Sequence, residues 1–317
     1  MVSHTKSWSN ESMALESGMG MGSKYFNLHD EYKTWHDMGV AVYGPPADDV
    51  NDHFVQVFNQ ARVNNTGIPS SRGVAVRKLR YEDYGSGTPS PATAGNQATW
   101  LLTTHPEQGD SNYRGVFLAT LAAARTNIYI ENSFFSDPLV ARMLMRKARE
   151  FRGRVSCTGL TEIQCAQRRR DAVRIHLVLP DASDKPIVDA VGTADFHEML
   201  HLGIKIHRWG PASGWSASRM LHTKAWLIDY EPGRGGLAYV GAANATQRSH
   251  LSDNEAGILT RSPEFAREVY ERLFVPDIAV DSRLEGAEGF HIVWSSNPVV
   301  RASRWLRRLL VDLLWFI

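Results

Sequence analysis

This chain of 317 residues has few cysteines, no long hydrophobic run and almost no net charge. Cys157 and Cys165 are too few for a disulfide framework or a thiolate zinc site, so we expect free thiols in a reducing compartment rather than a local disulfide. No run of about 18 apolar residues occurs, and residues 1–11 are polar, so we predict neither a transmembrane helix nor a signal peptide. We therefore expect an intracellular protein.

The charge balance argues against whole-molecule attraction to nucleic acid or to an anionic membrane. Thirty-five basic and 34 acidic side chains give a formal net charge of +1. Hydrophobic residues make up 43% of the chain, enough for a substantial core, and the length suggests about two domains. A segment rich in glycine, proline and serine separates two parts of the chain. We predict a first domain (1–80), a linker (81–97), a second domain (98–280) and a C-terminal extension (281–317).

The second domain alternates strand-like and helix-like segments. Apolar and β-branched runs predict strands, and segments with helical periodicity predict helices between them. The predicted strands are 99–103, 127–132, 173–179 and 204–209, and the predicted helices are 113–125, 138–150 and 186–202. Such alternation is typical of βαβ units, so we predict an α/β fold with mainly parallel sheets flanked by helices.

Two stretches of the chain repeat one another. His4 and Lys6 are answered by His222 and Lys224, and a carboxylate follows each histidine by 33 positions. The carboxylates are Asp37 and Glu255. With a one-residue gap, Gly22 to Tyr25 also answers Gly241 to Asn244. Equal spacing with matching flanks argues against coincidence and predicts two duplicated units that share one site.

The repeated residues suit phosphodiester chemistry. A neutral imidazole can attack phosphorus, and a second imidazole can protonate the leaving oxygen before the roles reverse. Asp37 and Glu255 could each hold the other nitrogen of an imidazole. Lys6 and Lys224 would share a strand face with their histidines and could bind the phosphate, with Asn244 donating a further hydrogen bond.

This chemistry needs no metal and no cofactor. Asp229 follows Lys224 by five positions, and we expect it to hold a turn rather than to take part in the reaction. The ten other histidines are interpreted as structural residues.

The second copy resembles the second His-Lys-Asp motif of the phospholipase D superfamily. The likeness rests on His222-x-Lys224 with Asp229, then on Gly241 to Asn244, and on Asn254-Glu255. Residues 128–135 are similar to the strand that opens the second catalytic domain of that family, and residues 35–37 resemble the segment that closes its first motif. Bacterial-type cardiolipin synthases and related phospholipase D proteins are the most similar members in general character, over about residues 1–280.

The resemblance implies a pseudo-twofold pair of α/β domains with one active site at their junction, a phosphohistidine intermediate and no metal. In that family the carboxylate after one motif supports the histidine of the other. Asp37 would therefore hold His222, and Glu255 would hold His4. Many phospholipases of the family use the first histidine as the nucleophile, but the present sequence leaves the choice open.

The first copy departs from the family pattern. Glu11 stands where the motif aspartate would be, Tyr25 stands where the asparagine would be, and only three residues precede His4. More than 90 residues of predicted strands and helices precede the second motif. We therefore expect an incomplete first domain, a shortened form of a longer enzyme, and doubtful activity for this chain alone.

Three functions remain open at this point. The first is a phospholipid phosphodiesterase or phosphatidyltransferase with a phospholipid substrate, and the second is a nuclease, which the near-neutral charge disfavours. The third is a noncatalytic remnant that keeps the fold. Residues 303–317 have helical amphipathicity and would make a peripheral membrane contact or else pack on the core. Arg168, Arg169 and Arg170 would form a solvated surface, with anion binding as the alternative.

Overall fold

The computed structural model describes residues 3–10, 13–20, 22–26, 34–64, 97–181, 183–185, 192–210, 220–280 and 282–286. Glu11, all of the predicted linker except residue 97, part of the predicted helix 186–202 and the amphipathic segment 303–317 lie outside these ranges. No helix in the described ranges is long and apolar enough to cross a membrane.

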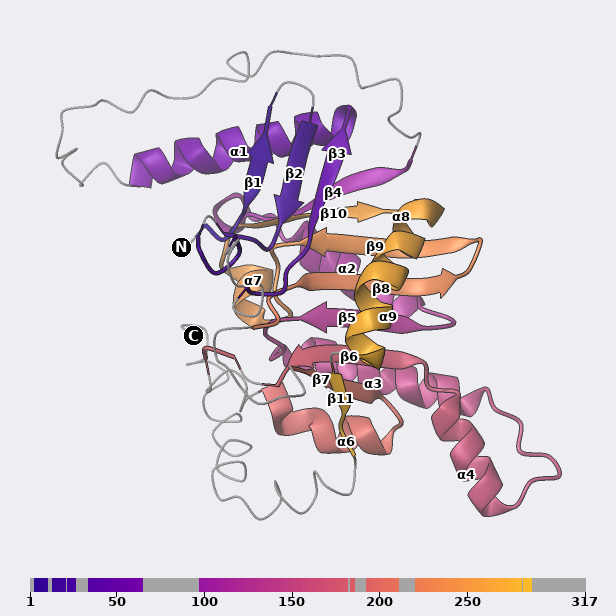
Figure 1. The fold of residues 1–317 in the computed structure, drawn as a ribbon. Coiled ribbons are helices and arrows are strands. Elements are labelled where there is room, and N and C mark those ends of the chain that lie inside the picture. Colours follow the sequence, from indigo (N-terminus) through magenta and orange to yellow (C-terminus); the bar gives the residue numbers. More distant parts are fainter. Residues whose placement is uncertain are drawn as a thin grey trace.

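The N-terminal part forms a small antiparallel sheet followed by one long helix. The strands run in the order β1–β2–β3 and are Ser7–Ser9, Met13–Ser17 and Gly39–Tyr43, with helix α1 at Pro45–Asn64. Along β3, Val40 and Val42 are buried while Ala41 and Tyr43 are exposed, the alternation of a strand with one covered face. Figure 1 shows α1 lying across this small sheet, at one end of the molecule.

A larger sheet of eight strands forms the body of the chain, in the order β11–β7–β6–β5–β8–β9–β10–β4. Its central strands, β5 and β8, are buried almost throughout because helices and the small sheet cover both of their faces. The strands are β4 Thr99–Thr104, β5 Ile128–Asn132, β6 Ile175–Pro180, β7 Lys205–Trp209, β8 Lys224–Glu231, β9 Gly235–Gly241, β10 Glu255–Thr260 and β11 Ser282–Leu284.

The α/β class is confirmed, but the prediction of a mainly parallel sheet is wrong for this sheet. Only the β5–β6 and β6–β7 pairs are parallel, and the other five pairs are antiparallel. The connections of the two parallel pairs contain helices α3 (Pro138–Gly153) and α4 (Glu162–Asp171), and helix α6 (Phe196–His201), respectively. Strands β8 and β9 are joined by a short turn at residues 232–234, and a turn of that length permits only antiparallel pairing.

Helices cover both faces of the large sheet (Figure 1). One core packs α2 and α3 against Ile128, Ile130 and Trp226. The opposite core joins Val40 and Val42 of the small sheet, and residues of α8 and the following turn, to Leu227 and Val240. The helices are α2 Asn112–Ala123, α3 Pro138–Gly153, α4 Glu162–Asp171, α6 Phe196–His201, α7 Gln247–Leu251, α8 Pro263–Val269 and α9 Val275–Ala279; short helical turns lie at Pro106–Gln108, Thr193–Asp195 and Tyr270–Phe274.

The small sheet has the same order of elements as one part of the large sheet. Strands β1, β2 and β3 pair antiparallel in sequence and lead into α1. Strands β8, β9 and β10 also pair antiparallel in sequence, with α7 inserted, and lead into α8. Both histidine motifs therefore stand immediately before the first strand of such a unit.

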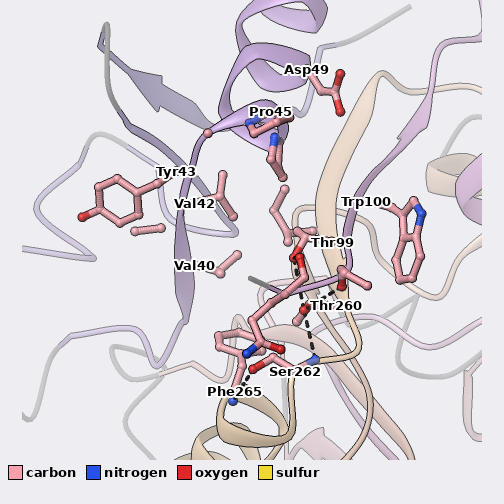
Figure 2. Close-up of a pocket in the computed structure, with 16 residues that line it drawn as sticks. Val40, Val42, Tyr43, Pro45, Asp49, Thr99, Trp100, Thr260, Ser262 and Phe265 are labelled. Atoms are coloured by element: carbon pink, nitrogen blue, oxygen red, sulfur yellow. Dashed lines mark hydrogen bonds between the residues drawn. The ribbon is translucent and has the colours of Figure 1, made fainter. Parts of the chain in front are cut away.

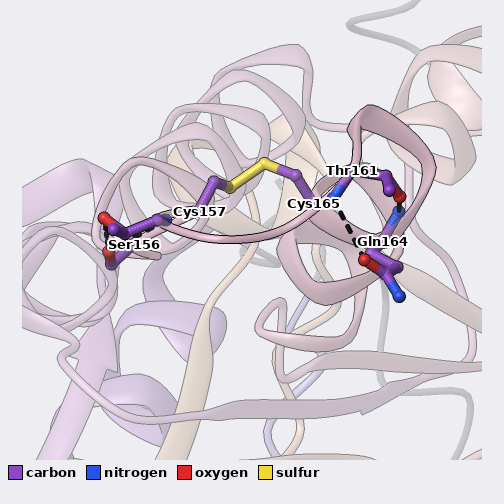
Figure 3. Close-up of a disulfide and its surroundings, with 6 residues drawn as sticks. Ser156, Cys157, Thr161, Gln164 and Cys165 are labelled. Atoms are coloured by element: carbon purple, nitrogen blue, oxygen red, sulfur yellow. Dashed lines mark hydrogen bonds between the residues drawn. A yellow bond between two sulfur atoms is a disulfide. The ribbon is translucent and has the colours of Figure 1, made fainter.

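The region 152–171 corrects the expectation of free thiols. Thr161 begins α4 with a capping box, in which its side chain accepts from Gln164 N–H and the Gln164 side chain accepts in return. This helix start brings Cys165 toward Cys157, with 5.3 Å between their Cα atoms, and the two form a disulfide (Figure 3). The cysteine count gave no information on that proximity. Arg168, Arg169 and Arg170 are exposed in the last turn of α4.

Candidate active site

His222 lies at the start of β8 and is bonded to a carboxylate from the N-terminal part of the chain. Its Nδ1 is 2.7 Å from Asp37 Oδ2, and only 8% of the His222 side chain and 1% of the Asp37 side chain are exposed. Asp37 precedes β3, and its Oδ1 accepts a hydrogen bond from the backbone N–H of Met38 at 2.8 Å. The bond to Asp37 occupies Nδ1, so Nε2 is the ring nitrogen that no carboxylate holds.

His4 is bonded in the same way to a carboxylate from the C-terminal part. Its Nδ1 is 2.9 Å from Glu255 Oε2, where β10 begins. Glu255 is completely buried, whereas 27% of the His4 side chain is exposed. The structure thus brings together each histidine and the carboxylate of the opposite copy, in the crossed pairing that the family resemblance implies.

Backbone hydrogen bonds repeat this crossed arrangement. His4 N–H donates to the carbonyl of Asn254 at 2.9 Å, and His222 N–H donates to the carbonyl of His36 at 2.7 Å. Each acceptor is the residue before the partner carboxylate. The hydroxyls of Thr5 and Thr223 donate to the same two carbonyls, both at 3.3 Å. The two halves of the site therefore fix one another through the main chain as well as through side chains.

The two lysines lie close to their own histidines. Lys224 Nζ is 2.7 Å from Nδ1 and 3.0 Å from Nε2 of His222, and it also donates to the His222 carbonyl. Lys6 Nζ donates to the His4 carbonyl at 2.6 Å. One amine at the His222 ring and one at the main chain of His4 provide positive groups where an anionic phosphate could bind.

Burial and neighbouring cations control the charge on His222. Burial first, then Lys224, Lys6 and His4, lower the pKa of His222 well below its usual value, so the ring is neutral at pH 7. Because His4 and Lys6 of the first copy lower the pKa of His222 in the second copy, the charges of the two copies act on one another. Burial also lowers the pKa of Lys224 to about 7 and raises the pKa of Asp37 to about 6.

Two aromatic residues at His222 were not assigned a role from the sequence. Tyr25 OH is 3.2 Å from His222 Nδ1, and the rings of Tyr25 and Trp35 lie 5.5 and 5.0 Å from the His222 ring between centroids. Lys24 Nζ lies 4.3 Å from the centroid of Trp35. Tyr25 takes the place of the family asparagine, so this departure from the motif still puts a polar group at the histidine. The sequence feature that could have identified Tyr25 as a site residue is its alignment with Asn244 in the internal repeat.

The remaining predicted residues have structural surroundings. Asn244 is buried after β9, and its Oδ1 accepts no hydrogen bond within the described part of the chain. Asp229 has a φ of 53° and accepts from the backbone N–H groups of Arg125 and Thr126, at 2.8 and 2.7 Å, so it ties β8 to the loop that precedes β5. A Cβ on Gly241 would lie 2.5 Å from the Cα of Gly257 on β10, which explains the glycine.

A cavity lies between the small sheet and the edge of the large one (Figure 2). Its volume is about 540 Å³, and its walls include Val40, Val42, Ile258 and Phe265, with Trp100 exposed at one side. None of the predicted site residues lines it. The cavity and the histidine pair are therefore separate features of the same interface between sheets.

Comparison with known proteins identifies several relatives. Residues 117–274 match a family model described as "Cardiolipin synthase, PLD-like domain". Human Phospholipase D1 is 24% identical over 192 residues, which cover 56% of this chain and 17% of that protein. Cardiolipin synthase A of Pseudomonas fluorescens (strain SBW25) is 31% identical over 108 residues, 34% of this chain and 20% of that protein. The chain thus spans a small part of these relatives.

One solved structure covers nearly the whole chain. The crystal structure of phosphatidylserine synthase from Haemophilus influenzae Rd KW20 aligns with a TM-score of 0.60 and 12% identity, over 98% of this chain and 68% of that one. At this level of identity the likeness concerns the fold.

Proposed function

Because the chain belongs to the phospholipase D superfamily, we propose that it is a phospholipid phosphodiesterase or phosphatidyltransferase that works through a covalent phosphohistidine intermediate. The observation that carries this proposal is the crossed pairing of His4 with Glu255 and of His222 with Asp37. Both imidazoles have Nδ1 on a carboxylate, which orients Nε2 and stabilises the positive charge that develops on the ring.

The charges favour His222 as the nucleophile. Its low pKa keeps Nε2 unprotonated, the form that attacks phosphorus. As the Nε2–P bond forms, the bond between phosphorus and the head-group oxygen breaks, and His4 donates a proton to that oxygen. Water or an alcohol then gives its proton to His4 and attacks phosphorus, which releases His222. Lys6 and Lys224 offset the negative charge on the nonbridging oxygens.

The proposed mechanism also gives roles to the residues around the two histidines, and it requires no cofactor. Asn244 and the hydroxyl of Tyr25 would donate hydrogen bonds near the phosphate. Asp229 and Gly241 would support the motif by tying β8 to the loop that precedes β5 and by keeping the close β9–β10 contact. Residues 303–317 would give a peripheral contact with the membrane that contains the substrate.

The proposal is tested by head-group release from phosphatidylglycerol or phosphatidylcholine vesicles. We expect His222→Asn to lower turnover by about 10⁴-fold or more, because the nucleophile is lost. His201→Asn, which replaces an exposed histidine on α6, is the matched control and should leave turnover unchanged. Equal turnover in the His222 and His201 variants would refute the proposal.

A substrate with a p-nitrophenyl leaving group separates the two histidine roles, because this group departs without protonation. His4→Asn should release a burst of about one p-nitrophenolate per chain from bis(p-nitrophenyl) phosphate and then stall, because no base accepts the proton of the attacking water. His222→Asn should give no burst. The reverse result would make His4 the nucleophile. Cleavage of DNA without lipid turnover would favour the nuclease, and silence in all of these assays would favour a noncatalytic remnant.

A further inference from the structure

Three potential metal ligands from distant parts of the sequence meet beside the histidine site. They are His36, which precedes β3, Glu131 on β5 and Asp277 on α9. His36 Nε2 is 2.9 Å from Asp277 Oδ2 and 3.7 Å from Glu131 Oε1, and one ligand atom of each residue lies within 4.8 Å of the others. Both carboxylates are buried, and 27% of the His36 side chain is exposed.

Glu131 is a completely buried carboxylate with few polar neighbours. Within the described residues no donor bonds either of its oxygens with good geometry, although the hydroxyl of Thr223 and the carboxyl of Asp277 are close enough to affect its pKa. Neither Glu131 nor Asp277 forms an ion pair with a lysine or arginine in that part of the chain. An isolated carboxylate in such surroundings is costly, so this one must either carry a proton or face a cation.

We propose that His36, Glu131 and Asp277 bind one divalent cation of the Zn²⁺ class. An imidazole and two carboxylates are ligands that zinc accepts, whereas magnesium and calcium prefer oxygen alone. Tetrahedral ligands at about 2.1 Å from zinc are about 3.4 Å apart, close to the two separations from His36 Nε2. With 27% of its side chain exposed, His36 is the ligand through which an ion would reach the buried carboxylates.

The surroundings already orient two of the ligands. Trp209 Nε1 donates to Asp277 Oδ1 at 3.0 Å, which leaves Oδ2 facing His36. The Trp209 ring stacks on the His36 ring with 5.1 Å between centroids. Such supporting contacts are typical of residues that present a ligand to a metal.

Binding here would tie the N-terminal part of the chain to the large sheet. His36 comes from one side of the boundary, and Glu131 and Asp277 come from the other. The carbonyl of His36 accepts from His222 N–H, and Asp37 is the next residue. The ion would therefore hold the segment that positions His222 without contacting the reacting groups, so this inference does not depend on the proposed phosphodiester chemistry.

The experiment is a Zn²⁺ titration of the chelator-treated chain by calorimetry, with the bound metal counted after dialysis. All proteins carry His201→Asn, because His197 Nε2 and His201 Nε2 lie 3.0 Å apart on α6 and could bind zinc independently. We expect one Zn²⁺ per chain and an increase of several degrees in melting temperature. Mg²⁺ should give neither.

Glu131→Gln preserves shape and should lower zinc affinity by more than about 10-fold, since a direct ligand is lost. Glu198→Gln, at a carboxylate with 54% exposure on α6, is the control and should bind as tightly as its parent. Asp277→Asn provides a second ligand variant if the first does not fold.

Unchanged affinity in both ligand variants would overturn the proposal. So would a parent chain that binds no zinc. If Glu131→Gln then also stabilises the chain, Glu131 and Asp277 share a proton instead, in line with the raised pKa of Glu131 that burial and the neighbouring carboxyl of Asp277 cause. Lipid turnover that fails while zinc still binds would count against the proposed function alone.

Discussion

Glu16 provides a direct test of the electrostatics of the small sheet. It lies on β2, is completely buried, and accepts a hydrogen bond from the hydroxyl of Ser7 on β1 through Oε1. Its other oxygen has no partner among the described residues. Burial raises the pKa of Glu16 from 4.5 to about 7, although Ser7 and Lys6 oppose this. The substitution to examine is Glu16→Gln, which keeps the shape and removes the ionisation.

The sign and size of the effect follow from the raised pKa. Because the folded pKa lies above the unfolded one, the stability contribution is complete below pH 4.5 and is lost as the pH rises through about 7. The full difference is about 3 kcal/mol at about 1.4 kcal/mol per pH unit, and most of it falls between roughly pH 5 and pH 8.5. The parent should lose that stability relative to Glu16→Gln.

The assay is urea unfolding of both proteins, followed by tryptophan fluorescence at several pH values between 5 and 8.5. The variant amide leaves buried N–H donors that can cost about 1–3 kcal/mol, but this offset is the same at every pH. Only the change of the difference with pH is therefore diagnostic. Titrating groups that do not interact with Glu16 occur in both proteins and cancel, whereas the charge of Lys6 is coupled to Glu16 and contributes to the measured difference. A difference that stays flat over this range would refute the reasoning and would mean that Glu16 ionises normally.

Three further predictions concern stability. Asp229→Ala removes the acceptor of three backbone N–H groups and a hydroxyl, so it should lower the free energy of unfolding by about 2–3 kcal/mol while turnover of the folded fraction persists; Asp229→Asn should cost less. Gly241→Ala forces a Cβ to within 2.5 Å of the Gly257 Cα and should lower the melting temperature clearly, unlike Gly115→Ala, where a Cβ meets nothing within 4 Å. Cys165→Ser should speed hydrogen exchange in residues 156–171 and change the main unfolding transition little.

Much of the second domain could be predicted from local patterns. Segments such as 128–132 are buried throughout, so their apolar and β-branched residues carry a strong strand signal. The capped helix α3 likewise begins at Pro138, after Asp137 accepts from Leu139 N–H, as the sequence indicated. The set of histidine, lysine and carboxylate was visible because the chain carries it twice.

Features that depend on distant contacts could not be predicted. The antiparallel pairing of β8 with β9 follows from the short turn between them, and β10 also pairs antiparallel with β9 although α7 lies between them; the alternation of elements upstream gave no information on either pair. His36 was an ordinary structural histidine in the sequence, because Glu131 and Asp277 follow it at long intervals and meet it only in the folded chain. The sequence shows the threonine within each His-Thr-Lys triplet, but it does not show which distant carbonyl accepts the hydrogen bond of the threonine hydroxyl.

The crossed bonds of His4 to Glu255 and of His222 to Asp37 mean that the proposed active site can form only when the two sheets are in contact. If the two sheets separate, both imidazoles lose their carboxylates together, and neither side keeps a working remnant. A mild denaturant, or a ligand that inserts between the two sheets, should therefore abolish turnover in one step, before either sheet unfolds. Docking itself would then act as an on–off control for the whole centre.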